Sequence, residues 1–203
     1  MYDQKLSTKT RVLLLRNTKA SSNIINNFEY KEIIKINDDF DFITFFDLRT
    51  AVEAYKELHK NFIDVNFCLH TQELENACQG TVFLSMKDMQ APLTDEEIHD
   101  ELEKFGEIKE VRDYKNFKKY VEFFDSRAAL EALKINVNAF NKGKVECKLA
   151  WDNNPKKREE LEQIVAKVIN EKEETGNVFV EALDEFIFSK LKQIEKMIRE
   201  RYN

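Results

Sequence analysis

The sequence predicts an α+β fold in which two tandem βαββαβ domains are followed by a C-terminal helical extension. A repeat gives the first indication: FITFFDLRTAVEA begins at Phe42 and YVEFFDSRAALEA begins at Tyr120. The offset of 78 residues (120 minus 42) is too long for a solenoid unit and suits a duplicated small domain. Both copies also show short apolar runs and amphipathic runs in the same order. Two copies of one small domain therefore account for most of the chain.

The first domain, residues 10–70, can be assigned element by element. Its strands are expected at RVLLLRN from Arg11, EIIKI from Glu32, FDFITFFD from Phe40 and NFIDVNFCL from Asn61. SSNIINNFE, from Ser21, predicts a short helix that serine opens. LRTAVEAYKEL, from Leu48, has apolar residues at helical spacing and predicts the second helix.

A short linker over residues 71–80 leads to the second domain, residues 81–151. Its strands are expected at TVFLSMK, EIKEVRDY, KKYVEFFD and GKVECKLAW. The first helix, TDEEIHDELEKFG, has Thr94 as N-cap, Glu97 as capping-box partner and Gly106 as its stop. SRAALEAL predicts the second helix. This order builds a ferredoxin-like, four-stranded antiparallel sheet with two helices on one face, which leaves the other face open.

Residues 155–203 are expected to form helices. Pro155 lies near the first turn of one, and Gly176 interrupts the helical pattern. Apolar residues from Phe179 to Ile198 then follow one stripe of a helix of about 25 residues. Because large apolar patches rarely stay exposed, we expect the front of this helix to dock on its own chain. Its back half, Leu191 to Tyr202, would be free to pair with a second copy or with another protein.

Composition limits the classes of function. The net charge of −6 and the pI of about 5.3 argue against a general polyanion binder, but they allow a local basic face. No apolar stretch approaches the roughly 20 residues of a membrane span, and the N-terminus has no signal-peptide core. We therefore expect an intracellular protein of the nucleus, the cytoplasm or both.

Neither a cofactor nor a metal is expected. The three cysteines have no CxxC spacing, and Cys68 and Cys147 occupy matching places in apolar strands, as small core residues do. The three histidines are scattered along the chain. No Ser/His/Asp set, phosphate loop or pair of carboxylates supports catalysis, so we do not expect an enzyme.

Aromatic residues on the third strands are the candidate binding residues. The RNA recognition motif carries stacking rings at the third and fifth positions of an octamer on this strand. The first domain has Phe40 and Phe42 there, two residues apart and hence on one face. The second domain has Lys118 and Tyr120, and it adds Phe83 on its first strand.

Basic residues near these rings predict phosphate contacts. They are Lys115, Lys118 and Lys119 in the second domain and Arg16 in the first. In the first domain Asp38 and Asp39 replace the basic residue and the glycine of the octamer. We therefore expect the second domain to bind RNA more tightly than the first.

The repeated FFD-x-R stands where the third strand meets the second helix. Asp47 and Asp125 suit an N-cap or first-turn position, where a carboxylate favours the helix dipole. Arg49 and Arg127 follow two residues later and could reach back across the sheet edge. We interpret the repeat as a structural corner that joins strand to helix.

Several longer segments resemble one family. RVLLLRN, FFDLRTAVEAYKEL, GEIKEVRD and KKYVEFFDSRAALEAL are similar to the first two RNA recognition motifs of the Mei-two-like RNA-binding proteins, which are meiotic regulators. The resemblance covers roughly residues 10–151 and implies tandem domains that bind RNA. Helices stand where that family has its third, C-terminal motif.

Two functions remain open from the sequence. In the first, the two sheets read consecutive bases of single-stranded RNA, and the chain is a post-transcriptional regulator. In the second, the chain is a protein-interaction scaffold that kept the fold and lost most RNA binding. The acidic pI, the pair Asp38 and Asp39, and Lys118 at a ring position favour the second. We nevertheless favour the first, RNA binding.

Overall fold

The computed structural model describes residues 8–16, 21–37, 39–71, 73–74, 78–135, 140, 142–168 and 170. Both sheets lie in one compact unit that ends at Glu162, and the residues from Gln163 onward form a second unit.

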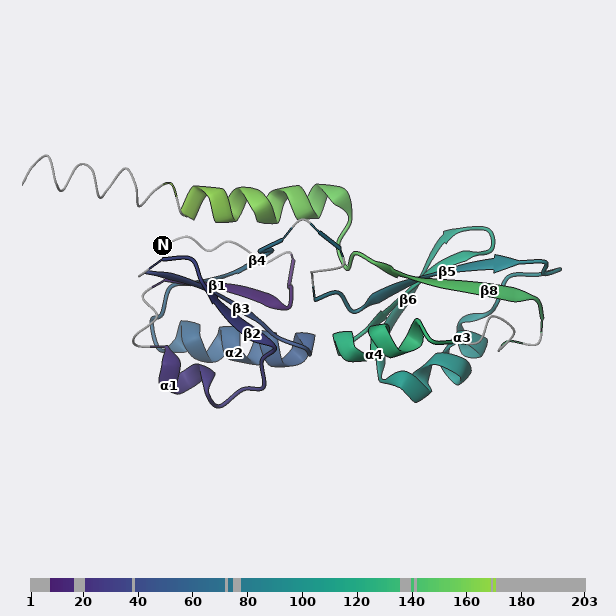
Figure 1. Ribbon diagram of the computed structural model, residues 1–203, viewed down its shortest axis with the longest axis horizontal. Helices are drawn as coiled ribbons and strands as arrows, with labels where there is room; N and C mark the ends of the chain where they lie inside the picture. Colours follow the sequence, from purple (N-terminus) through teal and green to yellow (C-terminus); the bar gives the residue numbers. More distant parts are fainter. Residues whose placement is uncertain are drawn as a thin grey trace, which may run out of the picture. The chain divides into compact units, whose positions relative to one another are not determined.

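The first domain is a four-stranded antiparallel sheet with two helices on one face (Figure 1). Its strands are ordered β2-β3-β1-β4. The elements are β1 (Val12–Arg16), α1 (Ser22–Ile25), β2 (Glu32–Lys35), β3 (Phe40–Thr44), α2 (Leu48–Lys60) and β4 (Val65–Cys68).

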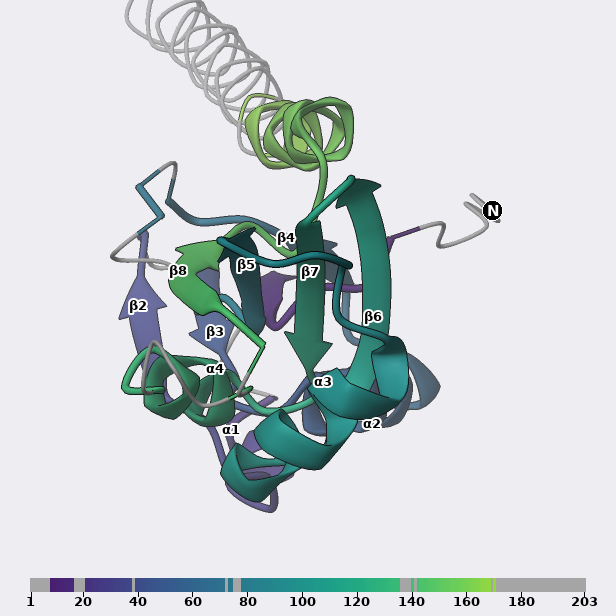
Figure 2. The same cartoon turned by 90° about the vertical axis from the view of Figure 1, so that its right-hand side faces the viewer.

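The second domain repeats this topology, with strand order β6-β7-β5-β8. Its helices again lie on one face of the sheet, as Figure 2 shows. The elements are β5 (Thr81–Lys87), α3 (Asp95–Leu102), the short 3-10 helix η2 (Glu103–Phe105), β6 (Ile108–Lys115), β7 (Lys118–Phe123), α4 (Ser126–Ala132) and β8 (Lys144–Ala150). The predicted α+β fold with two tandem βαββαβ units is confirmed.

Alternation along the strands builds one core in each domain. In β1, Leu13 and Leu15 point to the helices and pack with residues of α2. Small residues such as Ala51 and Ala54 on α2 let the helix approach the sheet closely. The second core repeats the arrangement with residues of β5, β7 and α4, among them Val82, Leu84, Val121, Phe123, Ala129 and Ala132. Each large side chain buried in this way contributes about 1.5–3 kcal/mol.

The predicted helix caps of the second domain are present. Thr94 and Glu97 form a complete capping box at the start of α3. Gly106 follows η2 at a φ of 156°, and an added Cβ there would lie 2.6 Å from the Cβ of Ala128. Glycine is therefore required at this stop both by the backbone conformation and by the close approach of α4.

The two repeated aspartates are also N-caps, as predicted. The Asp47 carboxylate accepts from the backbone amide of Arg49, and the Asp125 carboxylate accepts from that of Arg127. Both aspartates have extended backbone, which is the usual conformation of an N-cap.

A helix over residues 155–168 follows the second domain. It begins at Pro155 as predicted, and Leu161 in its second turn is buried. Gly176 and the apolar stripe from Phe179 to Ile198 lie outside the described residues, so the expected docking and self-pairing of that helix stay predictions. Among the described residues, no helix is both long and apolar enough to span a membrane.

Candidate nucleic-acid interface

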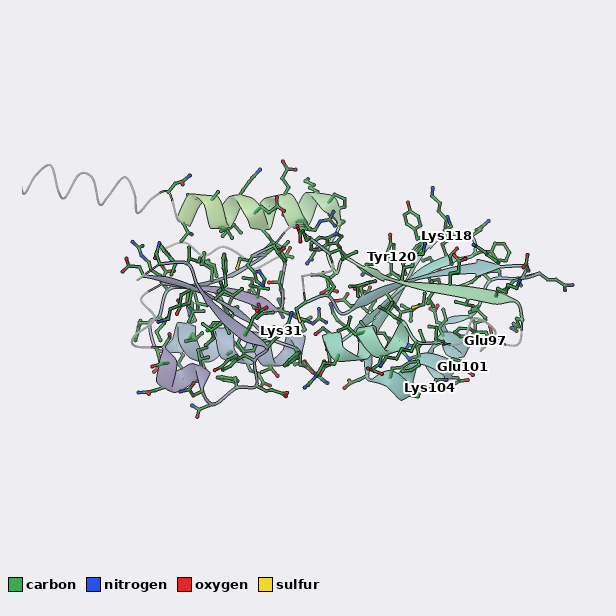
Figure 3. The ribbon with its side chains drawn as sticks, viewed as in Figure 1. Lys31, Glu97, Glu101, Lys104, Lys118 and Tyr120 are labelled. Atoms are coloured by element: carbon green, nitrogen blue, oxygen red, sulfur yellow. The ribbon has the colours of Figure 1, made fainter. Side chains whose placement is uncertain are left out.

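Three rings form a contiguous cluster on the open face of the second sheet. They are Phe83 of β5, Tyr114 of β6 and Tyr120 of β7, which we call the aromatic patch. The ring centroids of Phe83 and Tyr120 are 5.1 Å apart, those of Tyr114 and Tyr120 are 5.5 Å apart, and those of Phe83 and Tyr114 are 6.0 Å apart. Figure 3 shows Tyr120 and Lys118 on the side of the sheet opposite Glu97 and Lys104.

The register of the strands creates this patch. Phe83 pairs directly with Tyr120, and Tyr120 pairs with Arg112 on the other side. Neighbouring residues such as Val82 and Val121 point into the core, because side chains alternate along a strand. Three adjacent strands therefore each present one ring to solvent.

Tyr114 is a residue that the sequence analysis missed. Its side chain is 51% exposed, which makes it the most accessible ring of the patch. The register of β6 shifts between Asp113 and Lys115, so the strand is irregular beside it. Tyr114 lies two residues after Arg112, which places both on one face of a regular strand. The sequence does not show which face this is, because that depends on how β6 pairs with β7.

Cationic side chains surround the patch. The guanidinium carbon of Arg112 lies 5.9 Å from the centroid of Tyr120, and Nζ of Lys115 lies 5.3 Å from that of Tyr114. Lys118 shares the face of Tyr120 and pairs in register with Ser85. Within the described part of the chain, Lys118 forms no ion pair. Lys115 and Lys118 thus lie on the strands that carry Tyr114 and Tyr120, and their contact with RNA stays a prediction.

Lys119 does not belong to this face. Its side chain is buried and forms ion pairs with Asp95 of α3 at 2.6 Å and with Asp113 at 2.8 Å. Consecutive residues of a strand point to opposite faces, so Lys118 and Lys119 cannot both lie beside Tyr120. The expectation that Lys119 joins a basic cluster on the binding face is wrong.

The corresponding face of the first sheet is covered. Phe40 is 0% exposed, and the guanidinium carbon of Arg16 lies 5.7 Å from the centroid of its ring. On the same face Val12, Leu14 and Cys68 are buried as well. The expectation that Phe40 is an exposed ring is therefore wrong, because the outer residues of β1, β3 and β4 form a second buried layer.

Phe42 is half-buried beneath a histidine. The ring centroids of Phe42 and His70 are 5.6 Å apart, and His70 Nε2 lies 2.9 Å from the hydroxyl oxygen of Thr44. Burial lowers the pKa of His70, since it disfavours the charged imidazole. His70 follows the last strand of the domain, and its ring packs against that of Phe42.

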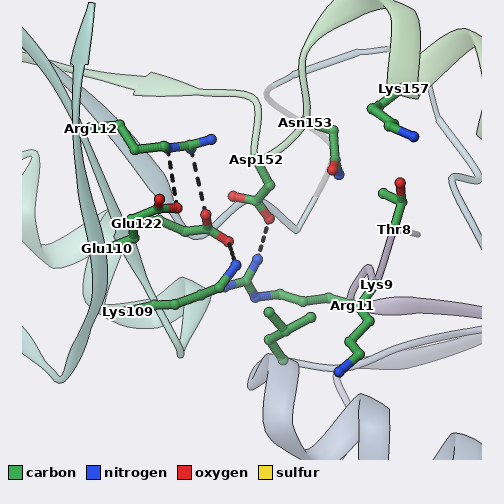
Figure 4. A pocket seen from close by; sticks show the side chains of 11 residues that line it. Thr8, Lys9, Arg11, Lys109, Glu110, Arg112, Glu122, Asp152, Asn153 and Lys157 are labelled. Carbon is green, nitrogen blue, oxygen red and sulfur yellow. Dashed lines mark hydrogen bonds and ion pairs between the residues drawn. The ribbon is translucent and has the colours of Figure 1, made fainter. Parts of the chain in front are cut away.

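A pocket of about 340 Å³ lies where the two domains meet (Figure 4). Five of its lining side chains are cationic and three are acidic. Glu122, which is buried, accepts from Nζ of Lys109 at 2.6 Å and lies 3.5 Å from Arg112. Burial raises the pKa of Glu122, and the nearby Asp152 adds to this rise. Arg112 thus touches both the pocket and the aromatic patch.

No metal site is found in the described ranges, where no cluster of three or more His, Cys, Asp or Glu side chains could hold an ion. The described cysteines are free thiols: Cys68 and Cys78 are buried, and Cys147 is half-buried. The expectation that Cys68 and Cys147 occupy matching places is wrong, because Cys68 pairs with Val12 at the start of β1, whereas Cys147 pairs with Leu84 in the middle of β5. Burial raises the pKa of the Cys147 thiol to about 12, so this thiol stays protonated at neutral pH.

Curated relatives match part of the chain. Over 105 residues it is 30% identical to Protein MEI2-like 4 of Arabidopsis thaliana, a stretch that is 48% of this chain and 11% of that protein. The chain resembles the MEI2-like proteins. Protein MEI2-like 4 of Oryza sativa subsp. japonica is 34% identical over 104 residues, which is 47% of this chain and 10% of the relative. The chain thus spans about a tenth of the length of these MEI2-like relatives.

No protein-family model matches the chain. Among solved structures, a complex of the Sxl-lethal protein with RNA is 14% identical, with a TM-score of 0.30, and the match covers 69% of this chain and 99% of that one. The assignment of two RNA recognition motif folds rests on the strand order of each sheet and on the MEI2-like resemblance.

Proposed function

We propose that this protein binds single-stranded RNA through the aromatic patch of its second domain. The observation that carries the proposal is the cluster of three rings from three adjacent strands, all within 6.0 Å of one another. Unstacked bases stack on such rings, and each stacked base contributes about 1–3 kcal/mol. Because every base has a π-face, stacking alone tolerates many sequences.

Local positive charge supplies the partner for phosphates. Arg112, Lys115 and Lys118 border the rings, and the exposed Lys148 pairs in register with Phe83. These four cations lie on one face of a chain whose net charge is −6. Phosphate contacts are then confined to this face, since the acidic remainder repels the RNA backbone.

The MEI2-like resemblance supports the same function and extends it. RNA binding of this kind suits a post-transcriptional regulator. In this proposal the first domain adds no stacking platform, because Phe40 is buried and Phe42 lies beneath His70. In this proposal, an RNA strand bound to the aromatic patch continues towards Arg112 and the pocket between the two domains.

The Tyr120→Ala variant of the full chain tests this function. Fluorescence anisotropy with a labelled random single-stranded RNA, at fixed salt, should show affinity weakened about 5- to 150-fold, which corresponds to about 1–3 kcal/mol. The thermal midpoint should change little, because the ring lies on the solvent side of the sheet. The control is Phe62→Ala, which removes a ring that is 98% exposed and lies outside both sheets. Unchanged affinity in a folded Tyr120→Ala variant would contradict the proposal.

A protein-interaction scaffold is the second candidate, and the buried outer face of the first sheet favours it for that domain. A sheet whose outer residues Val12, Leu14 and Phe40 are all buried is not offered to bases. If the wild-type chain fails to bind single-stranded RNA even at low salt, where phosphate contacts are strongest, the scaffold function takes the place of RNA binding.

A further inference from the structure

The FFD-x-R corner of each domain lies against the corner of the other. The amide of Leu48 donates to the carbonyl of Phe124 at 2.9 Å, and the amide of Ser126 donates to the carbonyl of Phe46 at 2.9 Å. The two N-capping aspartates pair across the same contact as an isolated antiparallel bridge. Each corner contributes the same donor and the same acceptor, which is the pattern of a two-fold contact.

The arginines of the repeat exchange aromatic partners between the domains. The guanidinium carbon of Arg49 lies 4.4 Å from the ring centroid of Phe124, and that of Arg127 lies 4.5 Å from the centroid of Phe46. The sequence predicted that these arginines could reach back across the sheet edge. They reach the other domain instead, where a planar guanidinium can stack on a ring.

Ion pairs follow the same exchange. Arg49 Nη1 lies 2.5 Å from a carboxylate oxygen of Glu107, in the second domain. Arg127 Nη1 lies 2.6 Å from a carboxylate oxygen of Glu29, in the first domain. Each arginine also pairs with the N-cap aspartate of its own helix, which holds the guanidinium in place for the contact across the junction.

A buried arginine fills the centre of the contact. Arg11 is 2% exposed. Its Nη2 donates to the carbonyls of Phe123 at 2.6 Å and Phe124 at 3.1 Å, and its Nε donates to the carbonyl of Phe46 at 3.2 Å. It also forms an ion pair with Asp152. A buried charge is tolerated only with such partners, and here most of them come from the second domain and the segment after it.

Arg11 and Gly80 occupy equivalent places in the two domains. The carbonyl of Arg11 accepts from the amide of Phe45, and the carbonyl of Gly80 accepts from that of Phe123, both at 2.8 Å. A Cβ on Gly80 would lie 2.1 Å from Nη2 of Arg11. If two first domains met through their corners, two arginines would have to share the space that Arg11 fills. If two second domains met, two glycines would leave the carbonyls at this contact without the donors that Arg11 supplies. The corner of a first domain is therefore expected to dock on the corner of a second domain, and not on the corner of another first domain.

We propose that the two FFD-x-R corners are reciprocal docking surfaces that hold the two domains as one body in solution, with Arg11 restricting each corner to the unlike domain. A linker of ten residues would otherwise leave each sheet free to reorient. The docked corners keep the two sheets in one relation whether or not RNA is bound, so this proposal does not depend on RNA binding.

Residual dipolar couplings of backbone amides test this in the full chain without RNA. One alignment tensor should fit the strands of both domains. The Arg49→Ser/Arg127→Ser double variant should need two tensors, and each domain should tumble faster. Both side chains are about half exposed, and the N-caps use backbone amides that serine retains. Each domain should therefore still fold.

Lys104→Ser is the matched control. Nζ of Lys104 lies 5.5 Å from the ring centroid of Phe105 and 2.8 Å from a carboxylate oxygen of Glu101. The variant therefore loses one contact with a ring and one with a carboxylate, both within the second domain. This variant should keep one tensor. If the serine variant loses its amide dispersion, Arg49→Lys/Arg127→Lys replaces it. Lysine keeps the charge but lacks the planar fork, so two tensors are again expected.

Two tensors in the wild-type chain would overturn docking itself. A single tensor in the folded double variant would overturn the role of the arginine corners. Tyr120→Ala should keep a single tensor even where it loses RNA affinity, so a failure of the RNA proposal and a failure of the docking proposal give different results.

Discussion

The two sheets share strand order and register, yet their open faces differ. Phe42 and Tyr120 occupy the same place in the repeat and are both half-buried, but Phe42 packs against His70, whereas Tyr120 contacts two other rings of its own sheet. The difference arises after the last strand of each domain. Cys68 of β4 pairs with Val12, and the chain then places His70 over its own sheet.

The second domain directs the matching residue elsewhere. Ala150 of β8 pairs with Thr81, and the second residue after it is Asp152. Asp152 accepts from the amide of Gly80 at 2.9 Å and from the hydroxyl of Thr81 at 2.7 Å, and it pairs with Arg11. His70 and Asp152 thus occupy equivalent positions, but His70 packs on the outer face of the first sheet, whereas Asp152 joins the two domains. The two copies keep one fold, and the residues that follow the last strand make their outer surfaces different.

Replacing Phe40 should give the largest effect. Phe40 and Lys118 are equivalent in the repeat, but only Phe40 is buried. Phe40→Ala should lower the free energy of unfolding by about 3–5 kcal/mol, the range for truncating a buried aromatic residue. Lys118→Ala should change it by less than about 0.5 kcal/mol, as surface substitutions usually do.

Urea unfolding followed by amide exchange in β3 and in β7 measures both variants. The loss in Phe40→Ala should appear first in the first domain. A loss below about 1 kcal/mol would mean that the outer face of this sheet opens readily, and the contrast between the two faces would then disappear.

Much of the fold could be read from the sequence, because it depends on local patterns. Strand alternation, the capping box at Thr94 and the aspartate N-caps each involve residues within a few positions of one another. The candidate site depends on contacts at long range. Tyr114 joins the patch through the register of β6 against β7, and Phe40 is buried by layers that meet only in the folded chain.

The FFD-x-R repeat shows the same limit. Its capping role is local and was predicted, whereas the partners of Arg49 and Arg127 lie 58 and 98 residues away along the chain. Arg11 carried no visible signal, since one arginine before an apolar strand usually remains at the surface.

Lys118 and Lys119 sharpen the comparison within the second domain. Lys118→Gln should weaken RNA binding and reduce the slope of log affinity against log salt by about 0.7, the value for one phosphate contact on a single strand. Lys119→Gln is the matched control, because its ammonium group faces Asp95 and Asp113 on the helical side. Its salt slope should stay at the wild-type value.

Anisotropy titrations at four or more salt concentrations give both slopes. Equal reductions in the two variants would mean that the RNA backbone follows the edge of the sheet and not its open face. An unchanged slope in Lys118→Gln would remove this residue from the phosphate path and leave the rings to carry the binding.

The smallest expected effect is a pH dependence of the cover over Phe42. Burial lowers the pKa of His70 below its ordinary value of 6.5, so the folded protein binds fewer protons here than the unfolded chain. His70 therefore contributes stability above pH 6.5, and this contribution is lost as the pH falls from 6.5 through the lowered pKa. Protonation also disfavours the packed position beside Phe42 and Thr44, because a charged imidazole is better solvated in water.

Urea midpoints at pH 7.5 and 5.5 should show this in the first domain. Wild type should lose more stability between the two values than His70→Gln, which cannot gain the charge. His59→Gln, which removes an exposed histidine on α2 of the same domain, is the control for the loss of a histidine ring away from Phe42. If His70→Gln and wild type lose the same stability, protonation of His70 does not loosen the cover. The burial of Phe42 would then depend on its apolar neighbours alone, and lowering the pH would not expose its ring.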